Sequence, residues 1–240
     1  MAKPLPHFAK LDGGEIIATA DQLARRIDER FHGFGLSRVA ATLVELAGST
    51  EAEVLLLTKP NVSIRIAVAA VLIAGALSLV LVASLIAVGH LEGGAISLVQ
   101  GIESTMNIAI LVGLGVIALT RLESLWKRRR ALASLHTLRS LAHVIDMHQL
   151  TKDPNGAQGS APPTASSPRR DLSPSQLARY LDYCTEMLSL LGKLAALYAQ
   201  SHQDSMIAQT VNEIEVLTTN LARKIWQKIA IIAETSPRVD

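Results

Sequence analysis

Apolar residues gather in two long runs along this chain. Residues 66–88 contain no charged side chain, and as a helix these 23 residues would be about 34 Å long, slightly more than the hydrocarbon core of a bilayer. A second uncharged run covers residues 104–120 and extends back to about residue 96 if Gln100 and Glu103 are included. The pattern predicts two transmembrane helices, at about 66–88 and 96–120.

The distribution of basic residues predicts the topology of these spans. Eight lysines and arginines precede residue 66, none lies between residues 66 and 120, and fifteen follow. Because segments rich in lysine and arginine stay on the cytoplasmic side, both termini are expected on the cytoplasmic side of an inner or plasma membrane. Only the short segment from His90 to Gly94 would then face outward, and the region 61–121 would form a transmembrane hairpin. The start of the chain is polar and does not predict a signal peptide.

The first 60 residues predict short amphipathic cytoplasmic helices. Apolar residues recur at helical spacing over 15–30 and again over 36–46, with Gly33 and Gly35 expected to separate the two helices. Thr50 and Glu53 have the spacing of a capping box, which predicts a third, brief helix that ends near Pro60.

Three further regions follow the second span. A membrane-proximal helix is expected over 122–152, ending at about Leu150, and a flexible linker rich in proline, glycine and serine over 153–172. Ser173, Pro174 and Gln176 then predict a capped helix start. Two heptad-like seams predict an antiparallel coiled-coil hairpin over 173–235. The seam residues are Leu177, Leu181, Cys184, Leu188, Leu191, Ala195 and Tyr198, then Ile207, Val211, Ile214, Thr218, Leu221, Ile225 and Ile232.

The sequence therefore predicts an all-α membrane protein, and composition excludes several function classes. A single cysteine excludes an intramolecular disulfide framework and any multi-cysteine zinc site. Aromatic residues make up only 3% of the chain, so base stacking on nucleic acid is not expected. No nucleophile elbow, paired-carboxylate or Walker pattern is present, so we expect no enzyme, no catalytic residue and no cofactor.

The densest polar cluster lies in the membrane-proximal helix: His136, Arg139, His143, Asp146 and His148. It is interpreted as a solvated or inter-helix polar face, with a regulatory anion or nucleotide site as one alternative and a metal site as another. His143 and Asp146 have the spacing of a metal-binding pair. No single helix presents three ligands at once, however, and Arg139 would repel a cation, so no metal is expected.

A second polar cluster interrupts the second span, at Gln100, Glu103, Ser104 and Asn107. Counting back from Arg121, Glu103 lies about 25 Å along the helix, near the outer interface, where a charge costs less than at the midplane. These residues either meet headgroups and water or line the outer mouth of a cation pore. Small residues in both spans (Ala70, Ala74, Ser78, Ala109 and Gly113) predict close helix packing.

Two spans cannot enclose a pore, so the pore hypothesis requires a homo-oligomer. Our first hypothesis is an oligomeric two-span protein that forms or gates an ion-conducting pore, with cytoplasmic helices for assembly and regulation. The alternative is a membrane-anchored scaffold that recruits a cytosolic protein partner through its coiled coil. A third hypothesis is an enzyme or metal sensor at the histidine cluster. The lipid bilayer is the one partner common to the first two.

Overall fold

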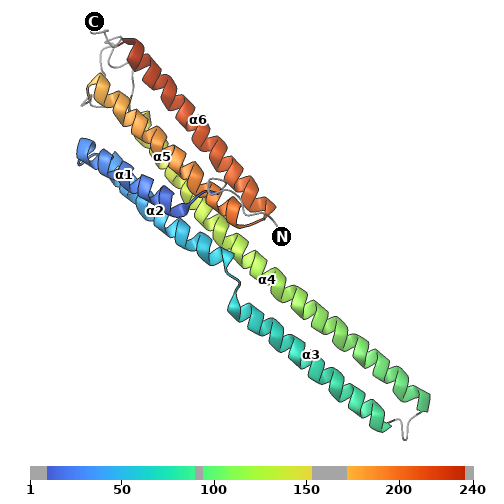
Figure 1. Ribbon diagram of the computed structural model, residues 1–240. Helices are drawn as coiled ribbons and strands as arrows, with labels where there is room; N and C mark the ends of the chain where they lie inside the picture. The colour runs from blue at the N-terminus through green and yellow to red at the C-terminus, as the bar shows by residue number, and fades with distance from the viewer. Residues whose placement is uncertain (1–9, 90–93, 153–171, 236–240) are drawn as a thin grey trace. The chain divides into compact units, whose positions relative to one another are not determined.

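The computed structural model describes residues 10–89, 94–152 and 172–235, and within them the chain forms six α-helices and no strand. Figure 1 shows α1 (Gly13–Phe31), α2 (Gly35–Thr58), α3 (Val62–Gly89), α4 (Gly94–Leu150), α5 (Pro174–Ser201) and α6 (Ser205–Thr235). The all-α prediction is confirmed. The expected outward turn (residues 90–93) and nearly all of the expected linker (153–171) lie outside the described residues.

The chain divides into two compact units. One, the core unit, consists of residues 1–58 and 130–240; the other, the apolar unit, consists of residues 59–129. Helix α4 is continuous over 57 residues and contributes to both units. Its end at Leu150 is where the sequence places the end of the membrane-proximal helix.

Helices α1 and α2 follow local sequence signals at most of their ends. The Asp12 side chain accepts a hydrogen bond from the backbone N–H of Gly14 (2.8 Å) and so caps α1. Gly33 has a φ of 77°, a conformation that glycine adopts without the strain of a Cβ atom. The predicted break between the first two helices at Gly33 and Gly35 is confirmed.

The prediction of a third short helix beginning at Thr50 is wrong. Helix α2 runs without interruption to Thr58, and Thr50 lies within it, 1% exposed. The physical reason is that the apolar face of α2 continues through Ala47 to Leu57, both buried. Burial of this continuous face outweighs a local capping pattern, whose residues are equally compatible with a helix interior.

Helix α5 lies at the centre of the core unit and contacts α1, α2 and α6. Its start is as predicted: Ser173 and Gln176 form a reciprocal capping box, with Pro174 in the first turn. Every residue of its predicted seam is buried, but so are residues outside that seam. These are Tyr180, Tyr183, Met187, Leu190, Leu194 and Leu197. A two-helix seam would leave them exposed, so α5 is covered on a wider arc because α1 and α2 also pack against it.

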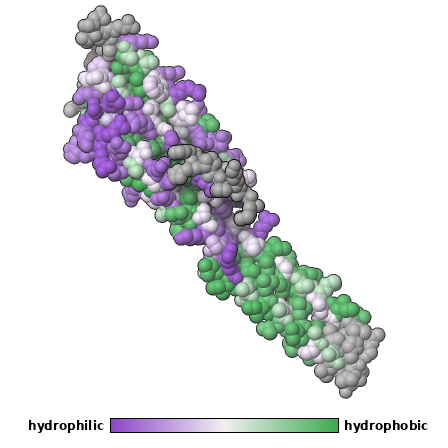
Figure 2. Space-filling model, in the orientation of Figure 1, coloured by the Kyte–Doolittle hydropathy of each residue, from purple (hydrophilic) through white to green (hydrophobic). Residues whose placement is uncertain are grey.

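The apolar unit consists of α3 and the first part of α4, and both carry uncovered hydrophobic side chains. Figure 2 shows a continuous hydrophobic surface over this unit. The two candidate spans have mean hydropathies of 2.8 and 1.9, with only 6% and 0% of their windows buried. The core helix of a soluble protein would instead be mostly buried. The protein therefore has two helices long and apolar enough to cross a membrane.

Helices α3 and α4 approach each other through glycines. A Cβ atom on Gly75 would lie 2.4 Å from Cγ2 of Val112, and one on Gly115 would lie 3.3 Å from Cγ1 of Val71. The small residues singled out in the sequence for packing are not the ones at this contact: Ala70, Ala74, Ser78, Ala109 and Gly113 are all exposed. Helix spacing alone does not reveal which of several small-residue stripes faces the neighbouring helix.

Candidate functional site

The polar face of α4 is the first candidate site. Gln100, Glu103, Ser104 and Asn107 are all exposed, in a helix whose surrounding residues are mainly apolar. Neighbouring Ile102, Met106 and Ile110 are also exposed, at 67%, 59% and 52%. The polar side chains therefore lie on an uncovered surface and not inside the α3–α4 pair.

Several hydroxyl groups of the two apolar helices are satisfied locally. Ser78 donates to the carbonyl oxygen of Ala74 (2.8 Å), and Thr105 donates to that of Gly101 (2.8 Å). Such bonds within one helix remove the cost of placing a hydroxyl in lipid.

The longer polar side chains of α4 have no such bond. Within the described part of the chain, no hydrogen bond or ion pair involves Gln100, Glu103 or Asn107. Ser104 likewise makes no side-chain hydrogen bond to a described residue. Placing an unsatisfied polar group in hydrocarbon costs roughly several kcal/mol of free energy, unless water or another polar group forms hydrogen bonds with it.

The position of this face on the helix explains why α3 does not cover it. Helix α4 faces α3 through Val112 and Gly115, and Gly101 lies on the same side. At about 100° of rotation per residue, Ser104, Gln100 and Asn107 lie about 50–110° around the helix from that side, and Glu103 lies about 150° from it. Only a molecule outside the α3–α4 pair can cover all four residues.

The histidine cluster of the sequence does not form one site. Among the described residues no hydrogen bond or ion pair joins any two of its five members, and no group of three or more His, Cys, Asp or Glu side chains is arranged to hold a metal ion. His136 and His143 are exposed. The remaining three members, Arg139, Asp146 and His148, contact neighbouring helices.

Two members of the cluster link α4 to α6. Arg139 donates to Glu213 at 2.5 Å, and the guanidinium group lowers the pKa of this carboxyl. Asp146 accepts a hydrogen bond from Gln149 and lies 3.7 Å from Nζ of Lys224. These contacts correspond to the inter-helix interpretation of the cluster.

His148 packs between α4 and α2. A Cβ atom on Gly35 would lie 2.4 Å from Cε1 of its ring, so the close approach of the two helices depends on glycine at this position. Desolvation by burial, with smaller contributions from Arg38 and Lys152, lowers the pKa of His148 below its usual value. The imidazole is therefore favoured in its neutral form.

A polar network around Glu53 joins three helices of the core unit and was missed by sequence reasoning. The Glu53 carboxylate accepts hydrogen bonds from Nε of Arg130 (2.8 Å), from the hydroxyl of Tyr198 (2.8 Å) and from Ser134. Burial, followed by contact with Glu53, raises the pKa of Tyr198 despite opposing hydrogen bonds, so the phenol remains a donor. The network fixes the end of α2 against α4 and α5.

The Glu53 partners could not have been found from local spacing. They lie 77, 81 and 145 residues away along the chain. In the sequence, Thr50 and Glu53 have the spacing of a capping box. Only the fold shows that the Glu53 carboxylate accepts instead from donors on α4 and α5. A pocket of about 370 Å³ lies beside the network. Its lining includes Thr50, Glu53, Arg130, Ser134 and Tyr198.

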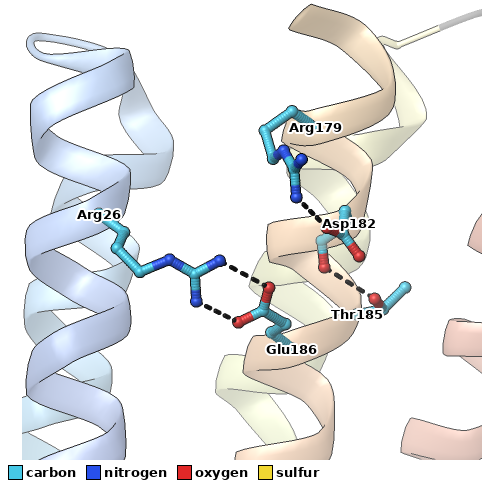
Figure 3. A network of polar contacts seen from close by, with 5 residues as sticks. All are labelled: Arg26, Arg179, Asp182, Thr185 and Glu186. Carbon is cyan, nitrogen blue, oxygen red and sulfur yellow. Dashed lines mark hydrogen bonds and ion pairs between the residues drawn. The ribbon is translucent and has the colours of Figure 1, made fainter. Parts of the chain in front are cut away.

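A second network joins α1 to α5 (Figure 3). The guanidinium of Arg26 meets both oxygens of Glu186, at 3.1 and 3.4 Å, and lies over the ring of Tyr183. On α5 itself, Arg179 pairs with Asp182 at 2.9 Å. These groups lie at the surface and orient α1 on α5. Glu186 also lines a pocket of about 410 Å³ between these two helices.

A polar clasp ties the start of α3 to α4 within the apolar unit. The carboxylate of Glu123 accepts from the backbone N–H of Asn61 at 3.1 Å and pairs with Lys127 at 3.0 Å. Lys127 also donates to the carbonyl oxygen of Lys59 at 2.9 Å. The backbone N–H of Asn61, and next Lys127, lower the pKa of Glu123. The clasp holds residues 59–61 against the part of α4 that follows its apolar run.

The single cysteine has a packing role, as the sequence predicts. Cys184 is fully buried in α5, and burial raises the pKa of its thiol to about 12. A thiol of this kind remains protonated and unreactive at neutral pH.

Compared with protein families, curated proteins and solved structures, the chain matches none of them.

Proposed function

We propose that this protein is an oligomeric two-span membrane protein that forms or gates an ion-conducting pore. In this proposal α3 and the first part of α4 cross the membrane as a hairpin, both termini are cytoplasmic, and the core unit assembles and regulates the oligomer. The observation that carries the proposal is the uncovered polar face of α4 at Gln100, Glu103, Ser104 and Asn107.

This polar face needs water or polar groups around it. Its four side chains have no partner within the described chain, and an apolar environment would leave their polar groups unsatisfied. Copies of the protein with these faces turned inward would surround them with water and with each other. A ring of Glu103 carboxylates would then concentrate cations at the mouth of the pore.

The core unit supplies a physical basis for regulation. Helix α4 continues from the proposed pore lining, without a break, into the core unit, where Glu53 binds it to α2 and α5. A change in the packing of the core unit would therefore act on the same helix that carries Glu103.

The experiment is conductance of the purified full-length protein in planar bilayers. We expect cation-selective currents, and we expect Glu103→Gln to lower the cation-to-anion permeability ratio, because it removes the charge and keeps the shape. Glu103→Asp should retain selectivity. Glu45→Gln, at an exposed carboxylate in the core unit, is the matched control and should leave the currents unchanged.

Two results would contradict the pore proposal. The first is absence of conductance in several lipid compositions with protein shown to be inserted. The second is a monomer or dimer by native mass spectrometry, because fewer than about four two-span subunits do not enclose an aqueous path. A ring in which α4 is innermost would support it.

The second candidate function is a membrane-anchored scaffold without a pore, and one observation favours it. Helix α6 exposes Met206, Val216 and Trp226, and a groove of about 430 Å³ between α5 and α6 is lined by Trp226 with Thr218 and Leu188 among others. An exposed tryptophan beside a groove is typical of a protein-binding surface. In this case Trp226→Ala should abolish partner binding by the full-length protein, whereas Glu103→Gln should not.

A further inference from the structure

The part of the apolar unit around the polar clasp carries a concentrated positive charge. Six basic residues fall within 59–65 and 121–129, against a single acidic residue, Glu123, which gives a net charge of +5 from +6 and −1. They are Lys59, Arg65, Arg121, Lys127, Arg128 and Arg129. In the sequence they form two separate groups more than fifty residues apart.

The clasp brings these two groups together. Asn61 and Lys59 bond directly to Glu123 and Lys127, so the start of α3 lies beside the turns of α4 that carry the arginines. Glu123 and Lys127 form an ion pair, and their side chains are only 20% and 12% exposed. Their two charges therefore cancel. The excess positive charge therefore belongs to the remaining five residues.

Four of those cations face outward. Lys59, Arg65, Arg121 and Arg129 are exposed, and no ion pair among the described residues involves any of them. We refer to these four as the basic collar. Arg65 interacts electrostatically with Glu123, but that carboxylate is already paired with Lys127. The collar therefore keeps an excess of positive charge and would attract an anion from outside.

Apolar side chains are interleaved with the basic collar. Val62 and Ile66 on α3 are 64% and 65% exposed, and Leu122 and Leu125 on α4 are 58% and 44% exposed. Trp126, at 46% exposed, lies between the arginines in sequence and is of the type enriched where hydrocarbon meets water. A soluble anion would use the cations and leave these apolar groups in water.

We propose that the basic collar binds the headgroups of anionic phospholipids. The phosphate group of such a lipid pairs with Arg65, Arg121, Arg129 or Lys59, and its acyl chains cover Ile66 and Leu122. Arginine forms paired hydrogen bonds to phosphate, and each basic residue near an anionic surface strengthens its attraction. The inference rests on the proposed membrane crossing, and it goes beyond it by naming the lipid class that the protein selects.

The test uses the fluorescence of Trp126 in the full-length protein. The chain has two tryptophans, so Trp226→Phe leaves Trp126 as the single reporter. This variant is reconstituted in vesicles of phosphatidylcholine mixed with phosphatidylglycerol, with bromine on the acyl chains of one lipid at a time. We expect brominated phosphatidylglycerol to quench Trp126 as if enriched about fivefold or more over its bulk fraction.

Matched charge variants distinguish the collar from general electrostatics. Replacing Arg65, Arg121 and Arg129 together by Gln should reduce the enrichment to about onefold. Replacing Lys10, Arg30 and Arg223, three exposed cations of the core unit, by Gln removes the same total charge and should leave the enrichment intact. If the collar variant fails to fold, the protein with an intact collar still provides a test. The enrichment of phosphatidylglycerol around Trp126 should fall steeply as the salt concentration is raised.

The remaining outcomes separate this proposal from the membrane crossing itself. Strong quenching by both brominated lipids, with no preference, would refute the headgroup site and leave the membrane crossing supported. No quenching by either lipid would refute the crossing. Loss of the preference in millimolar inorganic phosphate, at constant ionic strength, would show an anion site that does not require lipid and would overturn the proposal.

Discussion

The two units of this protein are both helical but place their apolar side chains in opposite ways. Every hydrophobic side chain that the structure buries in its described ranges belongs to the core unit, including Leu138, Leu188 and Tyr198. In the apolar unit most leucines and isoleucines are exposed, and Gly75 lets α3 approach Val112 of α4 closely. The hydrophobic effect therefore stabilises the first unit through burial, whereas the second leaves most of its apolar side chains uncovered within the described chain.

This comparison predicts its largest effect within a single helix. Leu138 and Leu111 both lie on α4, 0% and 68% exposed. Leu138→Ala should lower the free energy of unfolding by about 2–5 kcal/mol because it leaves a cavity in the core unit. Leu111→Ala should change it by less than about 0.5 kcal/mol. Urea unfolding of the full chain in detergent, followed by circular dichroism, measures both. Equal losses would mean that Leu111 has a packing partner in another copy.

The glycine contact predicts the next effect, now in the apolar unit. Gly75→Ala places a methyl group against the stiff side chain of Val112 and should destabilise the α3–α4 pair by about 1–3 kcal/mol. Gly113→Ala is the control, because nothing lies within 4 Å of the position of its Cβ atom. Resistance to unfolding in sodium dodecyl sulfate measures the difference. The double variant Gly75→Ala with Val112→Ala should recover most of the loss.

The Glu53 network of the core unit predicts a smaller effect. Glu53→Gln keeps the shape but replaces the charged carboxylate that accepts from Arg130 and Tyr198 by a neutral amide oxygen. It should lower the stability of the core unit by about 1 kcal/mol. Glu45→Gln, at an exposed position on the same helix, should have no effect. Thermal unfolding measures both, and an unchanged midpoint for Glu53→Gln would show that the network contributes nothing to stability.

The smallest predicted effect is a pH dependence at His148. Its pKa is lowered in the fold, so the folded state keeps it neutral while the unfolded chain takes up a proton. The stability from this group is therefore complete above its ordinary pKa of 6.5 and is lost as pH falls below that value. His148→Gln should weaken the loss of stability on acidification, whereas His143→Gln, at an exposed position, should not. Unfolding midpoints measured from neutral to mildly acidic pH test this difference.

Much of the helical organisation is readable from local patterns, and the failures have a common cause. Gly33 and the box of Ser173 with Gln176 set helix ends through bonds within a few residues, so sequence predicts them. Thr50 and Glu53 have the same kind of signal, but burial of the face through Ala47 and Leu57 outweighs it. A local signal determines a helix end only where no tertiary contact competes with it.

The candidate sites show the same limit. The polar positions Gln100, Glu103, Ser104 and Asn107 stand out in the sequence because their neighbours are apolar. That they lie uncovered by α3 depends on which stripe of α4 meets Gly75, and no local pattern fixes this. The histidine cluster has suggestive spacing, yet Arg139 turns to Glu213 and His148 to Gly35 because α6 and α2 pack on either side.

The sequence by itself determined the helical content, the two long apolar helices and the separation of charge from them, because each depends on residues close together in the chain. Tertiary structure alone decided the partners of Glu53, the glycine contact of Gly75 and the bond of Asn61 to Glu123 that joins the two basic segments. Each of these joins positions tens of residues apart, and only the packing of whole helices brings them into contact.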